Sequence, residues 1–196
     1  PDGSIDEKRW ATASETCQGL GFTCERSPAV YVGMEHYSKA CGNHEAASPN
    51  EKYVRGCMFA HFQAFSNVAR SNERTMILED DIVVPPSASG PSTNEHINAF
   101  LDTTMDADIA YVGHCFDGLC CHAMAVTPLG AQKVLNQVQW CSDEEVDVQL
   151  VKMCNSGQLK CAYAESINSL RDERVWGDGL INQRAGTEVR KRDWFP

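Results

Sequence analysis

Hydrophobic residues recur at helical spacing in several parts of the chain. In the clearest stretch, 56–70, the apolar residues lie three or four positions apart on one helix face: Met58, Phe62, Phe65 and Ala69. His61 falls on the same stripe, so we expect it in the core rather than at a ligand. The same spacing and typical capping residues predict four more helices: 5–20, one from Ser92, one from Thr127 and Pro128, and one from Ser142 to Gly157.

Short apolar runs between these helices predict four strands: 75–78, 108–112 (closed by Gly113), 122–126 and 159–164. Strands that alternate with helices are typical of an α/β fold with a mostly parallel central sheet flanked by helices. Residues 33–52 are polar and contain Gly, Asn and Pro, so we expect a loop there. No change in composition marks a domain boundary, and we expect one domain over 1–196.

The chain is acidic, with 17 Lys and Arg against 27 Asp and Glu and a formal net charge of -10. This balance argues against binding to nucleic acid and to an anionic membrane surface. No apolar run approaches the roughly 20 residues that a membrane-spanning helix needs. The chain has no initiator Met and no signal-like segment, as expected of a mature or trimmed protein.

Ten cysteines are spread along the whole chain. An even, high number favours disulfides in an oxidising compartment, the alternative being a reduced protein with cysteines in its core. The spacing lacks the paired Cys-x-x-Cys motifs of a structural zinc site. Two pairs are close enough to join a helix to an adjacent strand: Cys17 with Cys24, and Cys154 with Cys161.

Three adjacent acids, Glu79, Asp80 and Asp81, follow the predicted strand 75–78. In an extended chain Glu79 and Asp81 point to one side and Asp80 to the other. Ligands of α/β sheets bind beyond the carboxyl ends of the strands, so converging carboxylates here predict a site for Mg²⁺ or Mn²⁺. The alternative is a solvated acidic turn.

Several segments form a recognisable series along the chain: 20–30, 56–61, 76–82, 107–113, 121–126 with Gly130 and Ala131, Val146-Asp147-x-x-Leu150, and 179–183. Together they resemble glycosyltransferase family 25, which includes lipooligosaccharide and procollagen galactosyltransferases. The match covers most of residues 17–185. It departs from the family pattern at Ala60 and Cys121, where the family usually has serine and threonine.

The resemblance implies a nucleotide-sugar-binding, GT-A-like fold and inverting, metal-dependent transfer of a hexose. The implied donor is a UDP-sugar, first of all UDP-galactose, and the acceptor a saccharide or a hydroxylated protein. With the cysteines, it implies the lumen of the ER or Golgi, or secretion. The family's first, nucleotide-binding strand has no counterpart before residue 5, which implies a trimmed or shortened domain with 171–196 as a C-terminal extension.

By the same resemblance, Asp81 is the most direct ligand of the metal, and Glu79 is the second metal candidate. Glu79 and Asp80 are expected to contact the metal, water or the ribose of the donor. Gly113 and His114, at a strand end, are candidates for donor binding. The role of each of these residues is an expectation that rests on its match to the family's segments.

Inversion needs a base that takes the proton of the acceptor hydroxyl. Asp147 is the first candidate, because it lies on the apolar stripe of its predicted helix, where an acid is costly unless it is paired or functional. The alternative is a structural carboxylate in an ion pair or facing water. His122, at the start of a buried strand, is a second candidate unless it is a satisfied structural histidine, and Asp178 is a weaker third.

Two other functions compete with sugar transfer. A catalytically silent, secreted carbohydrate- or protein-binding module on the same fold would fit the changes at Ala60 and the missing first strand. A metal-dependent phosphotransferase or phosphatase would use the acidic turn, but the chain lacks an Asp-x-Asp-x-Thr nucleophile motif.

Overall fold

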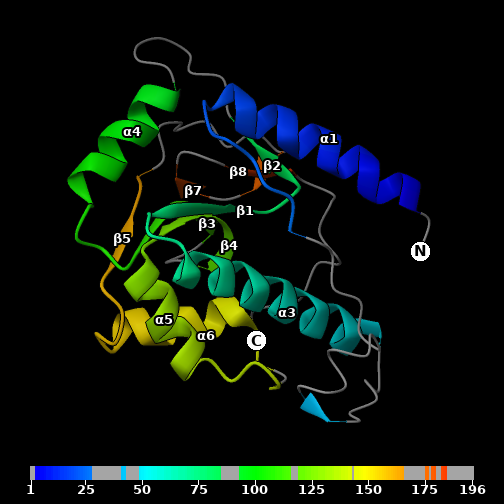
Figure 1. The fold of residues 1–196 in the computed structure, drawn as a ribbon, viewed down its shortest axis with the longest axis vertical. Coiled ribbons are helices and arrows are strands. Elements are labelled where there is room, and N and C mark those ends of the chain that lie inside the picture. Colours follow the sequence, from blue (N-terminus) through cyan, green and yellow to red (C-terminus); the bar gives the residue numbers. More distant parts are fainter. Residues whose placement is uncertain are drawn as a thin grey trace.

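A computed structural model of the chain describes residues 3–27, 41–42, 49–84, 93–115, 119–142, 144–165, 175–176, 178–179 and 182–184 (Figure 1). Its helices are α1 (Gly3–Gly19), α3 (Pro49–Arg70), α4 (Thr93–Thr103), α5 (Pro128–Gln137) and α6 (Val146–Asn155). Its strands are β1 (Thr75–Leu78), β2 (Ile82–Val83), β3 (Ile109–Cys115), β4 (Leu119–Val126), β5 (Cys161–Tyr163), β6 (Val175–Trp176), β7 (Asp178–Gly179) and β8 (Asn182–Arg184).

The main sheet is mixed, so the prediction of a mostly parallel sheet is wrong. Its strand order is β1-β4-β3-β5, with β7 also paired to β3, and only the β3–β5 pair is parallel. Strand β3 does not close at Gly113 but continues to Cys115, and β4 begins at Leu119. The three residues between them can join only antiparallel strands, because a parallel pair needs a crossover of a dozen or more residues.

Helices cover both faces of the main sheet, as expected for the α/β class (Figure 1). On one face, α3, α5 and α6 enclose a core that includes Met58, Phe65, Tyr111, Met124 and Leu150. On the other face, the end of α1, β2 and α4 enclose a second core that includes Leu20, Ile82, Ile97, Val112 and Ala123. Successive strand residues point to opposite faces, which is why the neighbours Tyr111 and Val112 belong to different cores.

Two helix starts differ from the sequence prediction. Helix α3 begins at Pro49, within the stretch expected to be a loop. The sequence prediction missed this start because the first turn of the helix is polar and carries no apolar stripe. Helix α6 begins at Val146 after Glu145, and not at Ser142. The Ser142 hydroxyl instead accepts the amide of Glu144 at 3.3 Å, so it shapes the turn before the helix. Ser92, the expected cap of α4, lies outside the described residues.

The cap of α5 and the predicted short disulfides are confirmed. Thr127 Oγ1 accepts the amide of Gly130 at 3.0 Å. Cys17 is bonded to Cys24, and Cys154 to Cys161. Two further disulfides are Cys41–Cys141 and Cys115–Cys120, so eight of the ten cysteines are paired and only Cys57 and Cys121 are free thiols.

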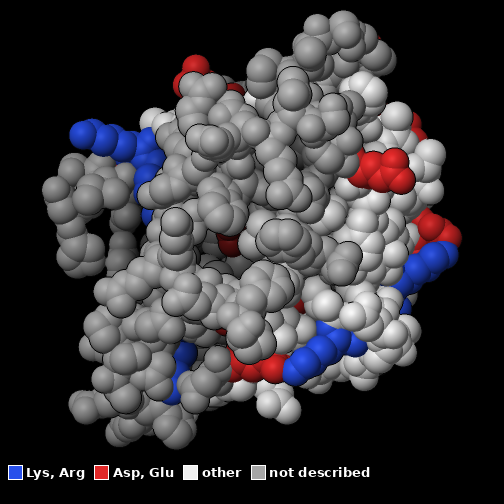
Figure 2. Space-filling model, turned by 180° about the vertical axis from the view of Figure 1, so that it is seen from behind, with Lys and Arg blue, Asp and Glu red and all other residues white. Residues whose placement is uncertain are grey.

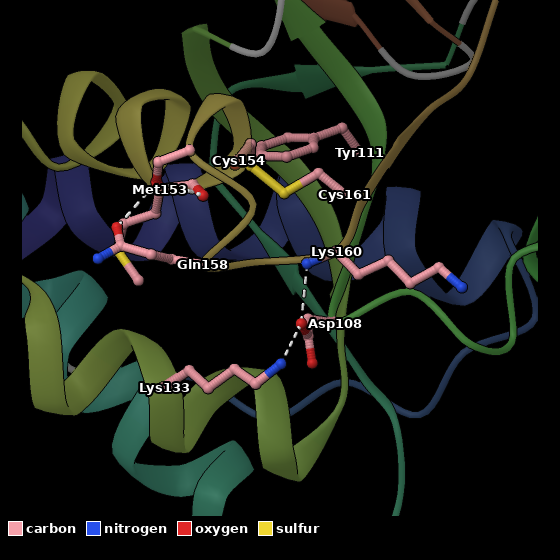
Figure 3. The surroundings of a disulfide bond; sticks show 9 residues. Asp108, Tyr111, Lys133, Met153, Cys154, Gln158, Lys160 and Cys161 are labelled. Atoms are coloured by element: carbon pink, nitrogen blue, oxygen red, sulfur yellow. Dashed lines mark hydrogen bonds and ion pairs between the residues drawn. A yellow bond between two sulfur atoms is a disulfide. The ribbon is translucent and has the colours of Figure 1, made fainter.

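A buried carboxylate holds the junction of β3, α5 and β5 beside the Cys154–Cys161 disulfide (Figure 3). Asp108 Oδ2 accepts Lys133 Nζ at 2.6 Å and the amide of Lys160 at 2.8 Å. The Asp108 side chain is only 8% exposed, so these hydrogen bonds satisfy a charge that burial would otherwise make costly.

None of the described helices is both long and apolar enough to cross a bilayer. On the face shown in Figure 2, some acidic and basic side chains of described residues lie next to one another and others lie apart. In the described part of this face, side chains of both signs are therefore present.

Candidate functional site

The acidic turn at the end of β1 divides into an inner and an outer part. Its backbone is fixed to β4, because the amide of Glu79 donates to the carbonyl of His122 at 2.9 Å. The Glu79 side chain is half-buried and Asp81 is buried, with 9% of its surface exposed. Asp80 lies outside and forms an ion pair with Arg9 of α1, in which both side chains are about half exposed.

Helix α3 brings two further ligand-type side chains to this turn. Cys57 and His61 are four positions apart and so lie on one face of the helix. One ligand atom each from Cys57, His61 and Glu79 lie within 4.8 Å of one another. This cluster, which we call the Cys-His-Glu cluster, joins the middle of α3 to the carboxyl end of β1.

The hydrogen bonds of His61 indicate which ring nitrogen is available for a ligand. Nδ1 lies 3.0 Å from the backbone carbonyl oxygen of Cys57, which can only accept, so Nδ1 carries the proton and donates it. Nε2 then holds the free lone pair. It is buried and has no hydrogen-bond partner among the described residues, on a side chain only 6% exposed.

The expected burial of His61 is thus confirmed, but its neighbours are polar as well as apolar. The Cys57–His61 spacing was the signal in the sequence that could have located the cluster, because residues four apart on a helix can share one ligand. Cys57 itself was not predicted as a site residue.

Asp147, the first candidate base, lies in the first turn of α6 and faces the start of β4. Its Oδ2 accepts the amide of Cys120 at 3.0 Å and its Oδ1 accepts the amide of Val148 at 2.8 Å. Asp147 has no cationic partner among the described residues. The helix N-terminus favours a negative charge at this position.

Cys120 connects Asp147 to His122. It has a φ of 62°, an unusual value for a residue other than glycine, and it is bonded to Cys115. Its amide donates to Asp147, and its carbonyl lies 2.9 Å from His122 Nδ1. The hydrogen bond and the complete burial of His122 fit the structural alternative for this histidine.

The acids and thiols of the site act on one another electrostatically. Burial raises the pKa of the Glu79 carboxyl well above its usual value, and the charges of Cys57, Asp81 and Asp147 raise it further, while His61 lowers it. Burial, with the charges of Asp147 and Asp81, raises the pKa of the Cys57 thiol to about 11. Burial and Asp147 also raise the pKa of Cys121. The raised pKa values favour the neutral forms of Glu79, Cys57 and Cys121, and a bound cation would favour their ionised forms instead.

The other predicted residues meet where β3 pairs with β7, one strand beyond β4 in the same row of the sheet, because Ala123 of β4 is paired with Leu78 on one side and with Gly113 on the other. Gly113 pairs with Gly179 and His114 with Asp178 in the backbone register. His114 is 7% exposed, and its Nε2 donates to the carbonyl of Ala164 at 3.2 Å. Their proposed roles in donor binding and catalysis stay predictions.

A surface hollow of about 580 Å³ lies beside the Cys41–Cys141 disulfide. Aromatic side chains of α3 and of the turn after α5 line it, with Phe62 and Trp140 packed edge to face at 5.1 Å between ring centres. Such rings can pack against the apolar face of a sugar.

No protein-family model matches the chain, and no curated protein or solved structure is significantly similar to it.

Proposed function

We propose that the chain is a metal-dependent glycosyltransferase that moves a hexose, galactose first, from a UDP-sugar to a saccharide or hydroxylated protein with inversion. Electrostatic coupling between three carboxylates supports this proposal, because the charges of Asp81 and Asp147 both raise the pKa of Glu79. These carboxylates come from the end of β1 and the start of α6, which lie far apart in the sequence.

The residues at the turn fit a divalent cation. Asp81 and Glu79 would hold Mn²⁺ or Mg²⁺, and Asp80, on the outer side, would keep its ion pair with Arg9. The cation would supply Lewis-acid stabilisation of the departing diphosphate. In this proposal the sheet and its helices form a GT-A-like domain whose metal-binding motif is the acidic turn.

Asp147 is the base of the proposed reaction. It takes the proton of the acceptor hydroxyl while the acceptor oxygen forms a bond to the anomeric carbon and the bond from that carbon to UDP breaks. UDP leaves with the bonding electrons, so the reaction is balanced without another reactant. The amides of Cys120 and Val148 each use one lone pair of the carboxylate and fix its orientation, and each oxygen keeps a second lone pair for the proton.

Four disulfides support a protein of the secretory lumen or of the extracellular space, since such bonds persist in oxidising compartments. Sugar transfer to glycans or to hydroxylated proteins would take place in the same compartments.

Calorimetric titration of UDP and UDP-galactose, with and without Mn²⁺, tests the donor site. We expect binding that requires Mn²⁺ and is lost in Asp81→Asn. Asp106→Asn is the matched control, because it makes the same chemical change at an exposed carboxylate that pairs with Lys160 away from the turn. Release of UDP from UDP-galactose, with water or an added acceptor, then tests for turnover.

The possible results separate the competing functions. Binding of a donor without UDP release under any acceptor would favour the silent binding module. If the protein unfolds cooperatively, and is therefore folded, but binds no nucleotide at any Mn²⁺ concentration, the proposal of a glycosyltransferase is refuted.

A further inference from the structure

The Cys-His-Glu cluster has a composition that a manganese or magnesium site lacks. Those hard cations prefer oxygen ligands, whereas a thiolate and an imidazole favour Zn²⁺ and similar borderline metals. Only one of the three cluster residues, Glu79, offers oxygen. The cluster therefore shares Glu79 with the carboxylate site of the proposed function but differs from it in its other ligands.

Its geometry suits a metal ion in three respects. The three ligand atoms lie within 4.8 Å of one another, close enough for one ion to reach all of them. His61 Nδ1 donates to a backbone carbonyl, which is the usual way in which a metal-binding histidine is oriented. This leaves the lone pair of Nε2 buried and without a hydrogen-bond partner in the described part of the chain, while Cys57 Sγ lies 3.6 Å from Nδ1 of the same ring.

The state of the cysteines is an independent observation. Eight of the ten cysteines form disulfides, yet Cys57 stays a free thiol next to a histidine and a glutamate. A thiol that binds a metal needs no disulfide partner.

We infer that Cys57, His61 and Glu79 bind one Zn²⁺ ion, with the remaining coordination position left to water or another small ligand. Three protein ligands and an open position are the arrangement of catalytic rather than structural zinc sites. The ion would also join α3 to the end of β1. This inference goes beyond the proposed function: it shares Glu79 with that function's metal site but requires neither a nucleotide sugar nor Asp81.

The test uses the full chain, kept without reductant so that the disulfides stay intact and stripped of metal with a chelator. Denatured protein should first show two free thiols. Zn²⁺ affinity is then measured by competition with a coloured chelator, and Co²⁺ is added as a spectroscopic substitute. We expect one Zn²⁺ per chain and, with Co²⁺, the near-ultraviolet absorption of a thiolate–cobalt bond.

Two variants and two matched controls locate the site. Cys57→Ser and His61→Gln should each weaken Zn²⁺ binding at least about tenfold, since losing even an outer partner of a ligand costs 10–100-fold. Cys57→Ser should also abolish the thiolate–cobalt band. Cys121→Ser, at the other free thiol, and His96→Gln, on α4, should keep the wild-type affinity.

Three results would overturn the inference: no free thiol in the denatured protein, unchanged Zn²⁺ affinity in Cys57→Ser, or the absence of Zn²⁺ binding by the folded wild type. Thermal unfolding of each metal-free variant shows that it is folded. Asp81→Asn separates this inference from the proposed function, because it should abolish Mn²⁺-dependent UDP binding and leave the thiolate–cobalt band in place.

Discussion

The substitution Asp147→Asn should both destabilise the fold and stop catalysis, for separate reasons. In the native protein each carboxylate oxygen accepts one backbone amide, from Cys120 and from Val148. Asparagine has a single acceptor oxygen, so its NH₂ group would face one of these two N–H donors. A donor left without an acceptor costs about 1–3 kcal/mol, and loss of the negative charge at the α6 N-terminus costs about 0.3–1 kcal/mol more.

An opposing effect reduces this loss. The charge of Asp147 disfavours the ionised form of the Glu79 carboxyl, so its removal relieves that repulsion. We expect the lost hydrogen bond to dominate, with a net destabilisation of about 2 kcal/mol. For a chain of this size that lowers Tm by roughly 4–8 °C.

Thermal unfolding followed by circular dichroism, with a chelator present, measures this change. Asp102→Asn, on the exposed face of α4, is the control and should leave Tm unchanged. A Tm for Asp147→Asn equal to or above that of the wild type would show that charge repulsion outweighs the two hydrogen bonds, and the argument for a positioned base would fail. Loss of the base should lower hexose transfer by about 10²–10⁴-fold with Mn²⁺-dependent UDP affinity retained.

Three further predictions concern packing, covalent links and thiol chemistry. Gly130→Ala should lower the free energy of unfolding by about 3 kcal/mol in urea titrations, because a Cβ there would lie 2.4 Å from a backbone carbonyl oxygen, whereas Gly19→Ala meets no atom within 4 Å and should not destabilise. Replacing Cys41 and Cys141 by serine should lower the free energy of unfolding by about 4.7 kcal/mol, because the bridge closes a loop of 100 residues. Removing the Cys17–Cys24 bridge, between cysteines seven residues apart, should cost about half as much, and equal losses would contradict the entropic argument. With a pKa of about 11, only about one Cys57 thiol in a thousand is ionised at pH 8, so iodoacetamide should label Cys57 slowly in the native protein and rapidly after unfolding. The rate of labelling in the native protein should rise about tenfold per pH unit up to pH 11. Fast labelling of the native protein at pH 8 would exclude the buried environment.

Local patterns in the sequence were sufficient for most elements of the fold. The apolar spacing over 56–70 and the Thr127 cap each reflect interactions within a few residues, and both helices are present. Sheet direction was not predictable in this way. It depends on how far β3 and β4 extend toward each other, and that extension includes Cys120 at a positive φ, which no pattern of hydrophobic residues signals.

The candidate site shows the same limit. The apolar strand before Glu79 and Asp81, and the apolar stripe of the helix that carries Asp147, identified these acids as lying near a core. The contact between Asp147 and the Cys120 amide joins α6 to β4, and the sequence contains no periodicity that specifies it. His61 was assigned to the core because its helix face is apolar, but the neighbour that changes its chemistry, Glu79, comes from another element.

The arrangement of the four disulfides has a consequence for oxidative folding. Three of them join cysteines five or seven residues apart, while the fourth joins Cys41 to Cys141 across 100 residues. Short loops close with little loss of chain entropy, so the three local bonds can form on a largely unfolded chain. The long bond needs α3 and the turn after α5 already in contact. Three-disulfide species that lack Cys41–Cys141 should therefore accumulate during refolding, and closure of the last bond should coincide with burial of the core on the α3 side of the sheet.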